Sequence, residues 1–158
     1  MTNNELIVVG VDGSEGSRRA LRWAVTEAHR TNAAVEAITA WYWEGAEGAM
    51  LAATNPREQV QHAERISSRE VNAITTELGS GTPIAREVVE GYPVAALVEA
   101  ARHARLLVLG SHGHGRLHHA VLGSVSDECV RQSACPVVII PLSHTEDAKK
   151  SAEPVPVS

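Results

Sequence analysis

The sequence contains no phenylalanine, and its aromatic residues are limited to three tryptophans and two tyrosines. A hydrophobic core must therefore be built from Val, Ile, Leu and Ala, which suit buried parallel strands covered by Ala-rich helices. With 158 residues and 44% hydrophobic side chains, the chain is long enough for one domain with a substantial core and too short for two. The scarcity of aromatic residues thus favours a single α/β domain.

Basic residues are also in deficit, since the formal net charge is −5 and no run of Lys or Arg interrupts the chain. Nucleic-acid binding usually requires a basic surface, so we expect no nucleic acid as a partner. No apolar run approaches the roughly 20 residues of a membrane span, and the first residues lack a basic region followed by an apolar stretch. We therefore expect a cytoplasmic protein with no membrane partner.

Neither the cysteines nor the histidines form a recognisable metal site. The two cysteines, Cys129 and Cys135, fit no zinc-binding spacing and are most simply interpreted as small apolar side chains. Five of the eight histidines fall between residues 103 and 119, but no cysteine or carboxylate accompanies them at a diagnostic spacing. We interpret them as exposed or phosphate-facing side chains and expect no metal site of the protein's own.

Five short β-branched runs alternate with longer stretches compatible with helices, at residues 6–11, 34–40, 84–89, 106–109 and 136–141. This alternation is typical of βαβ units that share one parallel sheet. The first run is continuously apolar, so both sheet faces should be covered. We predict an α/β fold with a single open sheet of five parallel strands and helices on both faces. The run at 106–109 should lie inside the sheet, and the run at 136–141, bracketed by prolines, at its edge.

The stretches between these runs predict four helices. The first follows the turn sequence Asp12-Gly13-Ser14 and carries an apolar stripe, the second spans about 57–78, the third starts near Pro93, and the fourth spans about 124–133. Residues 41–56 have no regular period and predict a mobile flap. We assign residues 1–142 to the domain and expect a disordered tail at 143–158, where apolar residues are too few to offset the entropy of ordering.

A glycine-patterned loop follows the run at 106–109 and ends where the fourth predicted helix begins. It reads Gly-Ser-His-Gly-His-Gly-Arg over residues 110–116 and Gly-Ser-Val-Ser over residues 123–126. Ligands of open parallel sheets bind beyond the carboxyl ends of the strands, and glycines with a helix N-terminus there favour an anion such as phosphate. His114 and Arg116 could add positive charge or be solvated. Ser124 with Asp127 could instead form a capping box that needs no ligand.

The spacing of Gly110, Gly113, Gly123 and Ser124 matches the motif G-x2-G-x9-G-[S/T]. Because of this motif, the chain resembles the universal stress proteins, specifically the branch whose members bind ATP. The resemblance covers residues 5–141 and implies a Rossmann-like sheet in strand order 3-2-1-4-5. It also implies a cofactor, ATP or another adenine nucleotide, and allows a nucleotide-bound Mg near Asp12. With His114 and Arg116 included for their charge, the predicted nucleotide-binding residues are Gly10, Val11, Asp12, Ala40, Leu109, Gly110, Gly113, His114, Arg116, Gly123, Ser124, Val125 and Ser126. Thr39 departs from the family, where a histidine is common.

Catalytic motifs are missing from the loop. The chain lacks G-x4-G-K-[S/T], whose lysine neutralises phosphate charge, and it lacks the G-x-S-x-G nucleophile elbow. We therefore expect a nucleotide-dependent stress-response or signalling module with at most slow hydrolysis. The alternatives are a cyclic AMP-binding protein, a weak nucleotide hydrolase, and an interaction protein whose loop stays empty.

The last predicted strand, at 136–141, points to a protein partner. An apolar strand at a sheet edge exposes unpaired backbone groups, which soluble proteins usually cover. We expect a homodimer in which two copies of this strand pair across a two-fold axis, as the resemblance also implies. The alternative is an edge protected by its prolines alone.

Overall fold

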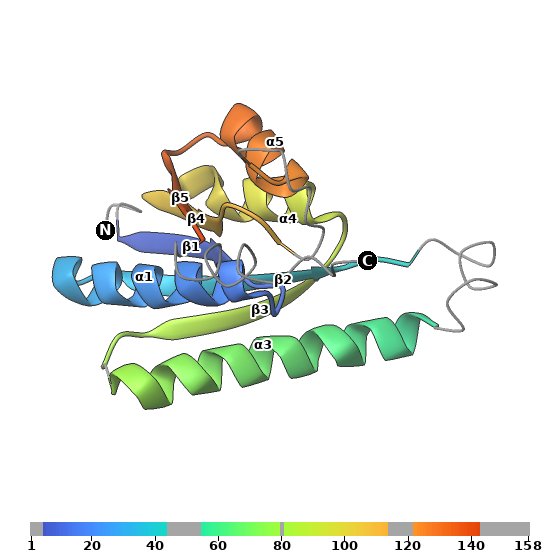
Figure 1. Cartoon of the computed structure of the whole chain (residues 1–158), viewed down its shortest axis with the longest axis horizontal. Coiled ribbons are helices and arrows are strands. Elements are labelled where there is room, and N and C mark those ends of the chain that lie inside the picture. Colours follow the sequence, from blue (N-terminus) through green and yellow to red (C-terminus); the bar gives the residue numbers. More distant parts are fainter. Residues whose placement is uncertain (1–4, 44–54, 80, 114–121, 143–158) are drawn as a thin grey trace, which may run out of the picture.

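A computed structural model describes residues 5–43, 55–79, 81–113 and 122–142. Its five strands are β1 (Leu6–Gly10), β2 (Ala34–Trp41), β3 (Ile84–Glu90), β4 (Leu106–Gly110) and β5 (Val137–Ile140). All neighbouring strands are parallel, and the sheet order is β3-β2-β1-β4-β5 (Figure 1). The predicted α/β fold, the strand order, the interior position of β4 and the edge position of β5 are confirmed.

Helices cover both faces of the sheet, as predicted. The helices α1 (Glu15–Thr31) and α3 (Pro56–Leu78) lie on one face, and α4 (Pro93–Ala100) and α5 (Ser124–Gln132) lie on the other (Figure 1). A short 3-10 turn, η1 (Ala101–His103), extends α4. Two apolar clusters fill the two interfaces, one between the sheet and α1 and α3, the other between the sheet and α4 and α5.

The sequence explains where α1 begins, where it ends and which face it buries. The Oγ of Ser14 accepts a hydrogen bond from the N–H of Ser17 at 3.2 Å, which satisfies one of the donors that a helix start leaves unpaired. Asn32 ends the helix in the left-handed conformation with φ 56°. The predicted apolar stripe is fully buried against the sheet and comprises Ala20, Leu21, Ala24, Val25 and Ala28.

The predicted element boundaries differ from the observed ones by one or two residues. Val11 lies beyond the end of β1, although its N–H still donates to the carbonyl of Ile38 at 2.8 Å. The polar helix α3 begins at Pro56 behind an Asn55 cap, and Gly79 closes it in the left-handed conformation with φ 55°. Most of the predicted flap and the whole predicted tail lie outside the described residues.

Both cysteines behave as the sequence suggested. They are unpaired, Cys129 is fully buried in the cluster under α4 and α5, and Cys135 packs against the same cluster. Burial, with a smaller contribution from Glu128, raises the pKa of the Cys129 thiol to about 11. A thiol in this environment stays protonated and packs as a small apolar side chain.

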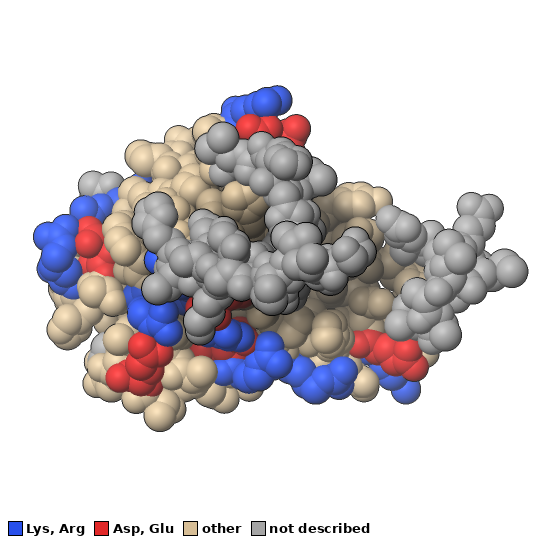
Figure 2. All heavy atoms as spheres, in the orientation of Figure 1, with Lys and Arg blue, Asp and Glu red and all other residues tan. Residues whose placement is uncertain are grey.

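Charges of both signs are interleaved along α1 and α3 on the face shown in Figure 2. Ion pairs link the two helices on this side, including Arg18 with Glu70 and Arg22 with Glu77. This face carries no patch of a single sign among its described residues. Within the described segments, no helix has both the length and the apolar character needed to cross a membrane.

Candidate functional site

One cleft lies at the carboxyl ends of β1, β2 and β4, bounded by the first turns of α1, α4 and α5. It encloses about 190 Å³, whereas one water needs roughly 10–15 Å³, so it has room for an organic molecule rather than a single ion. Its lining residues are Gly10, Val11, Asp12, Ser14, Ser17, Ile38, Ala40, Pro93, Leu97, Leu109, Gly110, His112, Gly113, Gly123, Ser124, Val125 and Ser126.

Every predicted site residue that the structure describes lines this cleft. These residues come from β1 and its following turn, the end of β2, the end of β4 with its following loop, and the start of α5. His114 and Arg116, the remaining two, lie outside the described residues. Segments distant in sequence are thus brought together, as expected at the carboxyl edge of a parallel sheet.

The sequence prediction missed six of the lining residues: Ser14, Ser17, Ile38, Pro93, Leu97 and His112. The alternation of side chains along a strand could have found Ile38, because it lies two positions before Ala40 on β2 and shares its face. His112 lies within the predicted glycine loop. The other four belong to the first turns of α1 and α4, and their approach to the cleft depends on how those helices pack.

The first turn of α5 forms the polar end of the cleft. Its N-cap residue is Gly123, which has no side chain to satisfy the helix donors, and its own N–H donates to the carbonyl of Ser111 at 2.7 Å. The N–H of Asp127 is the first to be bonded within the turn, to the carbonyl of Gly123. The backbone N–H groups of residues 124–126 therefore have no acceptor within the helix.

One sequence interpretation of the serines in this turn is corrected. Ser124 is the first residue of α5 rather than its cap, so the capping-box alternative with Asp127 is wrong. The Oγ of Ser126 donates to the carbonyl of Gly110 at 2.6 Å. That bond ties α5 to the end of β4, and it leaves the Ser126 backbone N–H, rather than its hydroxyl, as the group available to a ligand.

Packing requires the glycine at the end of β4. A Cβ on Gly110 would lie 2.6 Å from the carbonyl carbon of Gly16 in α1, closer than real Cβ contacts. A Cβ on Gly10 would lie 2.9 Å from Cδ2 of Leu109, which is the end of a flexible side chain and can shift. The first turn of α1 can thus press directly against the end of β4, which draws Ser14 and Ser17 to the edge of the cleft.

Asp12 organises the turn between β1 and α1. Its Oδ1 accepts the N–H of Ser14 at 2.8 Å, and its own N–H donates to the Oγ of Ser17 at 3.3 Å. Gly13 between them has φ 82°, a conformation that favours glycine. The other carboxylate oxygen faces the glycine loop, because a Cβ on Gly113 would lie 2.7 Å from Oδ2 of Asp12. The aspartate therefore links the turn after β1 to the loop after β4.

The opposite end of the cleft is apolar. Ile38 and Ala40 of β2 meet Leu97 of α4 and Leu109 of β4 in the cluster on that face of the sheet. Thr39 is buried and does not line the cleft. This is the position at which the chain differs from the family that it resembles. Because side chains alternate along a strand, Thr39 points to the face covered by α1 and α3. The substitution there leaves the cleft wall unchanged.

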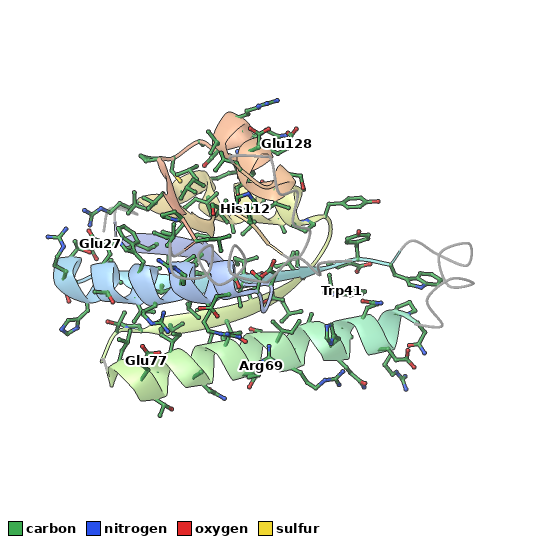
Figure 3. The ribbon with its side chains drawn as sticks, in the orientation of Figure 1. Glu27, Trp41, Arg69, Glu77, His112 and Glu128 are labelled. Atoms are coloured by element: carbon green, nitrogen blue, oxygen red, sulfur yellow. The ribbon has the colours of Figure 1, made fainter. Side chains whose placement is uncertain are left out.

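His112 lies in the loop after β4, between α1 and α5 in the view of Figure 3. Its Nδ1 is 3.0 Å from the Oγ of Ser111, and the residue lines the cleft. Across the described segments, no group of three or more His, Cys, Asp or Glu side chains is arranged to hold a metal ion. The rest of the histidine-rich stretch, at 114–119, lies outside them.

Comparison with known proteins shows a match to one protein family. Residues 3–141 match the model of the Universal stress protein family. A universal stress protein of Mycobacterium bovis is 31% identical over an alignment of 159 residues, and the alignment covers 90% of this chain and 48% of that protein. One from Mycobacterium tuberculosis is 33% identical over an alignment of 150 residues, and the alignment covers 85% of this chain and 47% of that protein. The chain spans about half the length of the curated relatives it matches.

Solved structures of similar fold include two with bound nucleotides. A universal stress protein in complex with cAMP superposes with a TM-score of 0.68 at 30% identity, over 88% of this chain and 98% of that one. A universal stress protein from Archaeoglobus fulgidus in complex with dAMP superposes with a TM-score of 0.62 at 23% identity, over 85% of this chain and 95% of that one. The second likeness establishes a shared fold.

Proposed function

The chain belongs to the universal stress protein family, and we propose that its cleft binds an adenine nucleotide, with the phosphates at the first turn of α5 and the base at the apolar end. One observation carries the proposal. The first turn of α5 opens into the cleft behind a glycine cap, and no side chain of its own satisfies its N–H groups. Such a turn attracts a phosphate through its donors and its dipole.

The other helices support this placement by contrast. In α1 the Oγ of Ser14 accepts the N–H of Ser17, and in α3 the Oδ1 of Asn55 accepts the N–H of Glu58. In α4 no side chain caps the first turn, but its first helical residue is Pro93, which has no N–H. Among the described α-helices, α5 therefore presents the most first-turn N–H groups, three, without a side-chain cap.

The apolar end of the cleft suits a nucleobase. Ile38, Ala40 and Leu97 offer flat apolar contact to a ring, while the small Ala40 leaves space for it. Asp12 also lines the cleft, and its carboxylate could accept from a ribose hydroxyl or hold water of a nucleotide-bound Mg. ATP is the proposed ligand, as the glycine motif implies.

Cyclic AMP is the second candidate ligand. It is favoured by the relative solved with cAMP, which shares 30% identity and covers 88% of this chain. Backbone N–H groups bind a phosphate without regard to how many phosphates follow it. Titration with both nucleotides distinguishes the two candidates.

We propose that nucleotide occupancy, rather than turnover, is the functional output. Phosphoryl transfer needs metal ligands and a positioned nucleophile or water, and the described residues of the cleft include a single carboxylate, Asp12. The protein would act as a cytoplasmic stress-response or signalling module with at most slow hydrolysis. Steady-state ATP turnover well above background, lost on changing Asp12 while binding is kept, would instead establish a hydrolase.

A homodimer completes the proposal. The edge strand β5 is apolar along its length and lies with its outer side unpaired within the described part of the chain. Pairing of two copies across a two-fold axis would cover both edges. A monomer in sedimentation velocity at tens of micromolar would refute this pairing.

The test of nucleotide binding uses two substitutions at one residue. Ser124→Pro removes one backbone N–H at the first helical position, where proline is well tolerated and the extended Gly123 before it is compatible. Ser124→Ala removes the hydroxyl and keeps the N–H. By calorimetry we expect the parent to bind ATP, Ser124→Pro to bind it roughly 10-fold more weakly, and Ser124→Ala to remain close to the parent.

The same experiment includes its controls. Mass spectrometry of the supernatant after denaturing the purified protein identifies any nucleotide that remains bound during purification. Both variants should unfold at the parent's temperature, because Ser124 is exposed. Equal ATP affinity of Ser124→Pro and the parent would place the phosphates elsewhere, and absence of binding to ATP, ADP, AMP and cyclic AMP would refute the function.

A further inference from the structure

Aromatic side chains are scarce in this chain, yet they gather beside the cleft. Of the three tryptophans and two tyrosines, all but Trp23 lie at positions 41–43 and 92. Trp41 ends β2, as Figure 3 shows, and Tyr42 and Trp43 follow it directly. Tyr92 is the cap residue of α4. The concentration of aromatics at one edge of the sheet calls for an explanation beyond core packing.

These aromatics are exposed rather than buried. The exposed fraction is 42% for Tyr42, 42% for Trp43 and 63% for Tyr92. Together they make up three of the five large hydrophobic side chains that are exposed among the described residues. Aromatic rings left in contact with water at the rim of a cleft mark a binding surface more often than isolated exposed side chains do.

Tyr42 and Tyr92 form a pair before any ligand arrives. Their ring centroids are 4.7 Å apart and their planes are tilted by 40°, within the range of favourable aromatic contacts. The backbone holds the two segments together, since the N–H of Gly91 donates to the carbonyl of Trp41 at 2.8 Å. The pair is therefore a preformed surface whose position is fixed by β2 and the start of α4.

Neither ring is among the residues that line the cleft, but each is attached to a lining residue at its apolar end. Tyr42 comes two residues after Ala40, Tyr92 directly precedes Pro93, and both Ala40 and Pro93 line the cleft. The first turn of α5, with its free donors, closes the opposite end. A ligand whose phosphates occupy α5 would direct its base toward the two tyrosines.

We infer that Tyr42 and Tyr92 form an aromatic rim that stacks on the nucleobase and gives the cleft a preference for purines over pyrimidines. This inference rests on the proposed nucleotide binding and assigns the two tyrosines a role in ligand specificity. Stacking strength grows with ring area, so a two-ring base gains more from the rim than a one-ring base does. The ribose and phosphates do not contact the rim and gain nothing from it.

The test compares three probes, ATP, UTP and ribose 5-phosphate, by calorimetry on the parent, Tyr42→Ala and Tyr92→Ala. We expect each Ala variant to bind ATP at least about 5-fold more weakly, in keeping with the effect of removing one aromatic ring from a base. UTP should weaken less, so the ratio of ATP to UTP affinity falls. Binding of ribose 5-phosphate should not change.

Matched variants separate stacking from other effects. Tyr42→Phe and Tyr92→Phe keep the ring and should bind ATP as the parent does. Val130→Ala removes an exposed apolar side chain of α5 away from the rim and should also match the parent. Because Tyr92 makes no side-chain cap bond to α4, the Ala variant at this position loses only the ring contact with Tyr42 and should unfold just slightly below the parent's temperature.

Two outcomes would overturn the inference while leaving nucleotide binding intact. One is unchanged ATP affinity in both Ala variants, which would point to a protein-docking role for the exposed rings. The other is an equal loss for ATP, UTP and ribose 5-phosphate, which would indicate a general disturbance of the cleft. If the parent itself binds none of the adenine nucleotides, the proposed function fails, and this inference fails with it.

Discussion

The guanidinium of Arg18 in α1 binds both carboxylate oxygens of Glu70 in α3. Its Nε donates to Oε2 at 2.7 Å and its Nη2 donates to Oε1 at 3.1 Å, and Glu70 is only 1% exposed. Hydrogen bonds from Arg18 and then Arg69, together with their charges, hold the pKa of the Glu70 carboxyl below its usual value. This contact fixes α3 against the start of α1, directly behind the turn that carries Asp12.

Removing Arg18 should therefore destabilise the fold strongly. Arg18→Ala leaves the buried Glu70 carboxylate with Arg69 alone, and we expect a loss of about 2 kcal/mol or more in the free energy of unfolding. The matched control is Arg22→Ala, which breaks a similar two-bond pair with Glu77 between the same helices at the exposed surface. We expect that change to cost at most about 1 kcal/mol. Urea unfolding measures both, and equal losses would show that burial of Glu70 does not matter.

Gly110 is predicted to stabilise the fold even without a ligand. Gly110→Ala would bring a Cβ to 2.6 Å from the carbonyl carbon of Gly16, so α1 and β4 must move apart. We expect the free energy of unfolding to fall by about 1–3 kcal/mol. Gly81→Ala is the control, because nothing lies within 4 Å of the Cβ it adds, and it should be nearly neutral. A Gly110→Ala protein as stable as the parent in nucleotide-free buffer would contradict this assignment.

Glu36 should make the fold less stable as the pH rises toward neutrality. Burial in β2, followed by a hydrogen bond and charge repulsion from Glu87, raises the pKa of Glu36 to about 7 from 4.5. The folded state thus favours the protonated carboxyl. This contribution is fully present below pH 4.5 and is lost as the pH rises through about 7.

Glu36→Gln removes this titration and supplies a neutral side chain at every pH. We expect the variant to be more stable than the parent at pH 8 and to show a flatter dependence between pH 4.5 and 7. Thermal unfolding across that interval measures the difference. Glu99→Gln, at a side chain that is 73% exposed on α4, should follow the parent. Identical pH profiles for Glu36→Gln and the parent would count against a buried, protonated Glu36.

Local sequence signals were sufficient for the sheet and for most of the cleft. Apolar runs located all five strands, and the stripe beginning at Ala20 gave the buried face of α1. The glycine spacing from Gly110 to Gly123 found the loop that forms the polar side of the cleft. Each of these features depends on residues that are close together in the sequence. The periodicity and spacing of residues can therefore predict them.

Other features required the packed molecule. The sequence allowed Ser126 to bind a ligand with its hydroxyl, and the structure gives that hydroxyl to the carbonyl of Gly110. It allowed Ser124 to cap α5, and the structure makes Gly123 the cap. Either alternative satisfies the local rules for helix starts, and the choice depends on where β4 ends relative to α5.

The amino-acid sequence by itself determined the α/β class and the glycine loop, because apolar runs and glycine spacing act through nearby residues. Only the tertiary structure decided that Leu97 and Ser17 line the same cleft. The same holds for the close backbone contact of Gly110 with Gly16 and for the ring contact of Tyr42 with Tyr92. Those contacts join segments far apart in the chain. Their existence depends on the register of parallel strands and the close approach of helices, which no local pattern encodes.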